Sequence, residues 1–161
     1  GSVWQTSKLL KFTPLFSDNL DLVFHKDHDL AQSQEPISWS ALSNEIFLDS
    51  GITKNMRSRL LLGPSKFDFP SITTLLAMLR SNLGVSVLPS LAIPQSSGEL
   101  RSRPLLPMEK RDICMITRHD WTLSPAAEAM IDTIIKEMPA QIEQLNLSPP
   151  SGLIPESGYQ L

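Results

Sequence analysis

The residues best placed to do chemistry are three hydroxyl side chains, Ser71, Thr73 and Thr74, at the start of a predicted helix. The first N–H groups of a helix have no partner within it, and the helix dipole adds partial positive charge there. Hydroxyls beside such N–H groups can bind a carboxylate or a phosphate. A structural interpretation competes, because Ser71 can cap the helix with its own side chain. From the residues alone, the cap is the preferred interpretation.

Two histidines, His25 and His28, lie among carboxylates and raise the question of a metal site. Positions three apart on a strand point to opposite faces, and no third ligand is evident elsewhere in the sequence. We therefore interpret them as solvated loop histidines.

Arg101 and Arg103 occupy alternate positions of a predicted weak strand. Alternate positions share one face, so the pair could meet an acidic ligand. A solvated strand face is the preferred interpretation, because arginine is mostly exposed in proteins.

The element that carries the hydroxyl group is a helix over residues 71–83, followed by a strand over residues 85–88. Its apolar side chains recur at helical spacing: Ile72, Leu75, Leu76, Leu79 and Leu83. We expect Gly84 to end the helix in the left-handed conformation. The strand is apolar without alternation, which predicts cover on both faces, and Pro89 ends it. Together they form half of an α/β unit.

The remaining elements follow from local patterns in the sequence. Apolar runs predict strands at 20–24, 45–48, 66–69, 100–105 and 112–117. Apolar spacing predicts helices at 52–62 and from Ser124 to Pro139, the latter begun by a serine cap and a proline at the first position. Ser38 is expected to cap a helical turn. The end of the chain, residues 139–161, is rich in proline and serine and is predicted to be disordered.

Composition excludes several function classes. The 161 residues fit one domain, and 14 basic against 17 acidic residues give a net charge of −3, so the chain has no overall attraction to nucleic acid. Cys114 is the only cysteine, which excludes an intramolecular disulfide and a cysteine-rich zinc site. Without a catalytic triad motif, a phosphate loop, an apolar span or a signal pattern, we expect no enzyme, no cofactor, no metal and no membrane segment, and a cytoplasmic location.

Three segments, taken in order, resemble the effector domain of LysR-type transcriptional regulators. Residues 79–94 (LRSNLGVSVLPSLAIP) are similar to a helix of its second lobe, ended by a glycine before a strand that closes in Leu-Pro. Residues 20–31 and 37–42 look like the strand that crosses between the lobes and the short helix after it. Residues 111–118 and 123–132 are similar to the returning strand and the final helix. The resemblance runs from about residue 14 to residue 138.

The resemblance implies an α/β lobe of a type 2 periplasmic-binding-protein-like fold, with three layers and a mixed sheet flanked by helices. It also implies five parts: a tag remnant and the end of the first lobe (1–19), a hinge strand and turn (20–31), the second lobe (32–110), the returning hinge strand and final helix (111–138), and a tail (139–161). Hinges near Val23 and Met115 would close the lobes on a ligand. The chain is then a fragment, with the DNA-binding helix-turn-helix upstream of it.

By the same resemblance, the start of the residue 71–83 helix lies on the wall of the cleft between the lobes. The implied binding residues are Phe69, Ser71 and Thr73, with Ser50 and Thr53 from a neighbouring turn. The expected partners are a small anionic or polar effector and further copies of the chain, with DNA contacted only through the absent helix-turn-helix. The alternative is a solute-binding lobe of a periplasmic-type binding or enzyme-regulatory protein.

Overall fold

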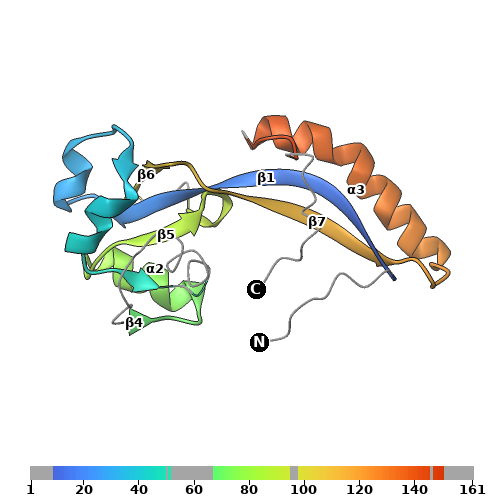
Figure 1. Cartoon of the computed structure of the whole chain (residues 1–161), viewed down its shortest axis with the longest axis horizontal. Coiled ribbons are helices and arrows are strands. Elements are labelled where there is room, and N and C mark those ends of the chain that lie inside the picture. The colour runs from blue at the N-terminus through green and yellow to red at the C-terminus, as the bar shows by residue number, and fades with distance from the viewer. Residues whose placement is uncertain (1–8, 50, 52–66, 95–97, 146, 151–161) are drawn as a thin grey trace. The chain divides into compact units, whose positions relative to one another are not determined.

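The computed structural model describes residues 9–49, 51, 67–94, 98–145 and 147–150, and the helix predicted over residues 52–62 lies outside them. The strands and α-helices follow one another along the chain as labelled in Figure 1: β1 (Leu10–His25), β2 (Ile37–Ser38), β3 (Leu48–Asp49), β4 (Phe67–Asp68), α2 (Ile72–Arg80), β5 (Ser86–Pro89), β6 (Leu100–Leu106), β7 (Lys110–Arg118) and α3 (Pro125–Gln144). Short 3-10 helices lie between them: η1 (Asp29–Gln32), η2 (Trp39–Asn44) and η3 (Ser90–Ala92).

Five strands form a mixed sheet in the order β2-β6-β1-β5, and β7 also pairs with β1. β1 runs antiparallel to β5 and β6, whereas β2 is parallel to β6. β3 and β4 form a separate parallel pair. A mixed sheet flanked by helices was predicted, and this prediction is confirmed. We expected the strand at residues 85–88 to be central because it is apolar without alternation. The order instead places β1 between β6 and β5, and β5 at its end.

The contacts of the chain divide it into two units, residues 1–18 with 111–161 and residues 19–110. β1 and β7 each contribute residues to both units. This division describes contacts and does not test the five predicted parts, which stay predictions.

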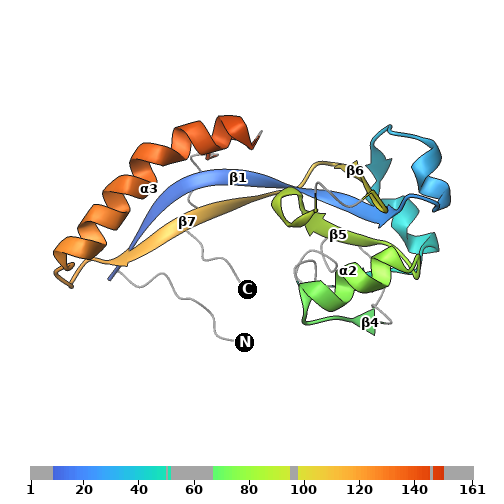
Figure 2. The ribbon, with the colours of Figure 1, turned by 180° about the vertical axis from the view of Figure 1, so that it is seen from behind.

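The unit of residues 19–110 has the three layers expected of it. On one face of the sheet, Trp39 and Leu42 of η2 pack with Leu22 and Phe24 of β1. On the other face, α2 packs over β5, and Figure 2 shows the two elements together. The apolar run is covered on both sides, because Val87 and Leu88 point to opposite faces and are both 0% exposed, as is Val85. Its predicted burial is confirmed.

Gly84 does not act as the expected left-handed terminator of α2. The left-handed residue is Asn82, with a φ of 53°, and the helix ends at Arg80, three residues before its predicted end at residue 83. Gly84 is needed for a different reason. A β-carbon at this position would collide with the carbonyl oxygen of Ile46, which accepts a hydrogen bond of 2.9 Å from the Val85 N–H. The glycine therefore lets two backbone segments meet.

β1 is much longer than the strand predicted at residues 20–24. It continues upstream through Ser17 and Asp18, two polar residues that are both buried. Both are satisfied within their own unit. Ser17 donates a hydrogen bond to the carboxylate of Asp112, and Asp18 accepts one from Arg111. Ser17 and Asp18 therefore belong to β1, and their side chains bond to side chains of β7.

The last helix begins as predicted and ends later. The Ser124 side chain accepts a hydrogen bond of 3.2 Å from the Ala127 N–H, and Pro125 occupies the first turn. The predicted end at Pro139 is wrong, because α3 continues to Gln144 with Pro139 inside it. A proline removes one helical hydrogen bond without forcing the chain to stop, when packing holds the next turn.

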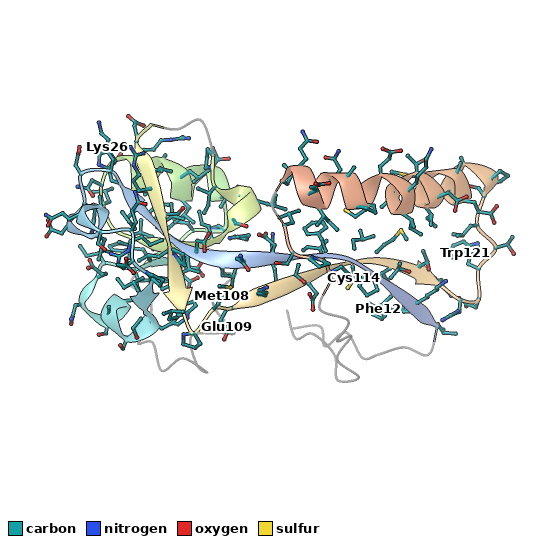
Figure 3. All side chains as sticks on the ribbon, turned by 90° about the horizontal axis from the view of Figure 1, so that it is seen from above. Phe12, Lys26, Met108, Glu109, Cys114 and Trp121 are labelled. Atoms are coloured by element: carbon teal, nitrogen blue, oxygen red, sulfur yellow. The ribbon has the colours of Figure 1, made fainter. Side chains whose placement is uncertain are left out.

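α3 runs alongside β1 within their shared unit (Figure 1). Ile135, Met138 and Ile142 of α3 line an apolar groove of about 460 Å³ together with Thr13 and Leu15 of β1. Figure 3 shows Trp121 on the connection that leads from β7 into α3.

Candidate functional site

The hydroxyl group predicted from the sequence lies at the N-terminus of α2. Ser71 has extended backbone (φ −104°, ψ 120°) and is the N-cap residue, but its side chain makes no capping hydrogen bond. Ser71, Thr73 and Thr74 are all exposed. The preferred structural interpretation of Ser71 as a side-chain cap is therefore wrong. The hydroxyls stand on the surface beside helix N–H groups, which are the donors that bind anions at helix N-termini.

The parallel pairing of β3 with β4 brings the end of β3 next to the segment that leads into α2. Leu48 pairs with Phe67 and Asp49 with Asp68, and the Phe69 N–H donates a hydrogen bond of 2.8 Å to the Asp49 carbonyl. Parallel strands end at the same edge of their sheet, and ligands of open α/β proteins bind outside that edge. The turn after β3 and the start of α2 are thus neighbours.

Asp49 is a residue of this edge that sequence reasoning treated only as part of a turn. It is 4% exposed, and its carboxylate accepts a hydrogen bond of 2.9 Å from the Gly51 N–H. Gly51 has a φ of 78°, a conformation that glycine adopts without strain. The Asp-x-Gly spacing is typical of a turn, and this hydrogen bond agrees with it. Only the pairing with β4 shows that the carboxylate fixes the turn beside α2.

Two aromatic rings adjoin the start of α2. Phe67 and Phe69 stack with ring centroids 6.5 Å apart and an interplanar angle of 24°. Phe69 is half-buried against the core below α2, whereas Phe67 is 49% exposed. An exposed ring next to hydroxyls and free N–H groups suits a ligand with an apolar body and a polar or anionic end.

The structure brings together part of the predicted site. Phe69, Ser71 and Thr73 lie on one short segment that joins β4 to α2. Ser50 and Thr53 lie outside the described residues. The binding role of all five residues stays a prediction.

The two histidines use their ring nitrogens locally. Nδ1 of His28 accepts a hydrogen bond of 3.3 Å from the Leu30 N–H, and its Nε2 lies 3.5 Å from a Glu45 oxygen. Nδ1 of His25 accepts from the Asp27 N–H at 3.2 Å. Within the described ranges, no three His, Cys, Asp or Glu side chains are grouped as metal ligands.

The arginine pair divides into an exposed and a buried member. Arg101 is exposed, whereas Arg103 is 9% exposed. The Arg103 Nε donates to the Glu35 carbonyl at 2.6 Å, and an Nη donates to the Leu30 carbonyl at 3.2 Å. The interpretation of both as a solvated strand face is therefore wrong for Arg103, which ties the loop after η1 to β6.

The thiol of Cys114 is half-buried on β7. Burial, and then the negative charge of Asp112, raise the pKa of this thiol above its ordinary value. A thiol with a raised pKa carries little thiolate at neutral pH, so Cys114 is not an activated nucleophile.

The chain matches the LysR substrate binding domain family over residues 2–139. It is 30% identical over 142 residues to the uncharacterized HTH-type transcriptional regulator YbhD of Escherichia coli strain K12. That match covers 81% of this chain and 44% of the relative, so the chain spans less than half the length of the regulator it resembles. Across the part of the chain that the structure describes, none of the helices has the length and apolar character to cross a membrane.

Solved structures share the fold of this chain. The effector binding domain of QuiR in complex with shikimate has a TM-score of 0.71 and 16% identity, over 86% of this chain and 70% of that one. The BenM effector binding domain with its effector benzoate has a TM-score of 0.70 and 20% identity, over 96% and 73%. At such identities the likeness establishes the fold, and the predicted fold class is confirmed.

Proposed function

The chain belongs to the LysR substrate binding domain family, and on that premise we propose that it is the effector-sensing part of a DNA-binding transcriptional regulator. A relative of this chain is an HTH-type regulator more than twice as long as the matched region. DNA binding is then the task of a helix-turn-helix in the parent protein. The acidic balance of these 161 residues fits a part that does not itself contact DNA.

The single observation that carries the proposed ligand site is the free N-terminus of α2. Ser71 does not use its hydroxyl for capping, and Thr73, two residues later, is exposed. Unpaired N–H groups, two hydroxyls and the Phe69 ring together favour a small acid with an apolar body. Ser50 and Thr53, which follow β3 in the sequence, are included in the proposed site.

The proposed mechanism is a population shift. A ligand that binds better to one conformation of the effector-sensing part stabilises that conformation, and the attached DNA-binding domains respond to the change. The strands that both units share, β1 and β7, are the elements through which the units remain connected. We include self-association and a cytoplasmic location in the proposal, because regulators of this kind act on DNA as oligomers. Catalysis is not part of it.

The test is an affinity measurement with small organic acids, beginning with benzoate and shikimate, the ligands of the two structural neighbours. Binding should weaken in Ser71→Ala and Thr73→Val. Because Ser71 makes no capping bond, its replacement should cost less than the roughly 1 kcal/mol of a lost side-chain cap. An affinity loss in this variant therefore reports on the ligand and not on helix stability.

Ser81→Ala and Thr133→Val are matched controls. Both remove a hydroxyl that bonds to a carbonyl of its own helix, from Ser81 to Ala77 and from Thr133 to Ala129, away from the α2 N-terminus. Ligand affinity should be unchanged in both. Equal affinities in all four variants and the wild type would remove Ser71 and Thr73 from the site.

A further inference from the structure

A second cavity lies in the unit of residues 19–110, formed by different residues from the α2 N-terminus. It has a volume of about 630 Å³ and opens between β1, the loop after η1, the segment after η3 and the first half of β6. Small-molecule sites usually fall between about 300 and 1,000 Å³. This cavity is large enough for a metabolite, and the proposed effector site does not use it.

The cavity lies where β6 has a free edge. β6 pairs with β1 through residues 100–104, but β2 joins its other edge only at Leu105 and Leu106. The first half of β6 is therefore flanked on that side by the loop after η1 and not by a strand. Polar side chains dominate the lining there: Asp21, Ser33, Gln34, Ser90, Arg101, Ser102 and Arg103.

The feature that points to a ligand is the uncompensated charge of Arg103. Its side chain is 9% exposed, and both of its hydrogen bonds go to neutral backbone carbonyls, those of Glu35 and Leu30. Arg101, at the rim, likewise donates only to the carbonyls of Gly98 and Leu100. A buried charge is costly unless an opposite charge accompanies it. Within the described residues, neither guanidinium forms an ion pair.

We propose that this cavity binds a small hydroxylated carboxylate, with its carboxylate between Arg101 and Arg103. These two side chains share one face of the sheet, because they pair with Phe24 and Leu22 of β1. Guanidinium groups bind carboxylates through paired, charge-assisted hydrogen bonds. Ser33 and Gln34 supply partners for hydroxyl groups. The inference is independent of the proposed effector site.

The test uses gluconate as the probe, titrated into the 161-residue chain by calorimetry and by NMR. Binding should saturate, and the shifted backbone signals should come from residues 98–104 and not from residues 69–73. Glucose, which lacks the carboxylate, should bind about tenfold more weakly or worse, because a charge-assisted hydrogen bond contributes roughly this factor.

Arg101→Gln should weaken gluconate binding about tenfold, since it removes one charged donor from the rim. Arg118→Gln is the matched control, because this exposed arginine pairs with Asp120 in the other unit, and its replacement should leave binding unchanged. Arg103→Lys keeps the buried charge and tests the role of the guanidinium shape. No saturable binding, or equal gluconate affinity in Arg101→Gln and the wild type, would overturn the proposal, whatever the result at Ser71.

Discussion

The carboxylate of Asp18 is 0% exposed and accepts a hydrogen bond of 2.9 Å from Arg111, which lies 93 positions later in the chain. The Arg111 side chain is 37% exposed, so the pair is only partly screened by water. Next to it, the Ser17 hydroxyl bonds to Asp112. These two contacts tie β1 to β7 inside one unit, at the residues where both strands leave it.

Replacing Arg111 with glutamine should lower the free energy of unfolding by about 2 kcal/mol, the scale of a hydrogen bond to a charged group. The loss should persist in concentrated salt, because one partner is buried. Thermal and urea unfolding measure it. Arg118→Gln is the control, since it breaks an exposed pair with Asp120 and should leave the midpoint unchanged. An equal decrease in the free energy of unfolding in both variants would mean that the burial of Asp18 does not strengthen its pair with Arg111.

Gly84→Ala should destabilise the chain by about 2 kcal/mol, as expected for forced overpacking. The added methyl group meets the Ile46 carbonyl oxygen, a backbone atom that cannot move without breaking its bond to Val85. Gly98→Ala is the comparison, because a β-carbon there has nothing within 4 Å. The prediction fails if the two alanine variants unfold at the same denaturant concentration.

Pro139→Ala should stabilise α3. An internal proline lacks the N–H that bonds to the preceding turn, and its cost relative to alanine is about 3 kcal/mol in a regular helix interior. Part of the gain will be offset by lost packing in the groove that Pro139 lines. Far-ultraviolet circular dichroism on heating reads out the change. Pro125→Ala should gain nothing, because the N–H of a first-turn residue has no helical partner.

The Cys114 thiol should react slowly with iodoacetamide at neutral pH. Burial and the charge of Asp112 raise its pKa, and only the thiolate reacts. The alkylation rate should keep rising at pH values where free cysteine has levelled off, and Asp112→Asn should move the midpoint down. The stability that the neutral thiol contributes is complete below the pKa of the unfolded thiol and is lost as pH rises through the folded pKa. A midpoint at or below that of free cysteine would contradict the assignment.

How far the sequence predicted this structure depended on whether a pattern was local. The cap of Ser124 and the burial of Val85 were predicted correctly, because a serine before proline and an unbroken apolar run have one common structural meaning. The sequence predicted β1 only over residues 20–24. Nothing local indicated that Ser17 and Asp18 extend this strand, since their partners Asp112 and Arg111 are distant in sequence.

The candidate site shows the same limit. The exposed hydroxyls at the start of α2 followed from the helix pattern, whereas Asp49 joins that edge only through pairing of β3 with β4. Arg101 and Arg103 occupy equivalent alternate positions on their strand. Nothing in the neighbouring sequence indicates that the Arg103 guanidinium bonds to the carbonyls of Leu30 and Glu35. The sequence correctly indicated that residue 84 needs to be glycine, but the expected reason, a left-handed helix end, was wrong. The actual reason is the nearby carbonyl of Ile46, which is too distant in sequence to be predicted from a local pattern.

The long strand β1 also has a consequence for synthesis of the protein. Its 16 residues leave the ribosome well before Arg111, the partner of Asp18, which follows Asp18 by 93 residues. At about 5–20 residues per second, β1 waits roughly 5–20 s for that partner. During this interval an apolar strand has unpaired edges, the condition that promotes association with other nascent chains. Production of the protein should therefore depend on chaperone capacity more strongly than its finished stability suggests.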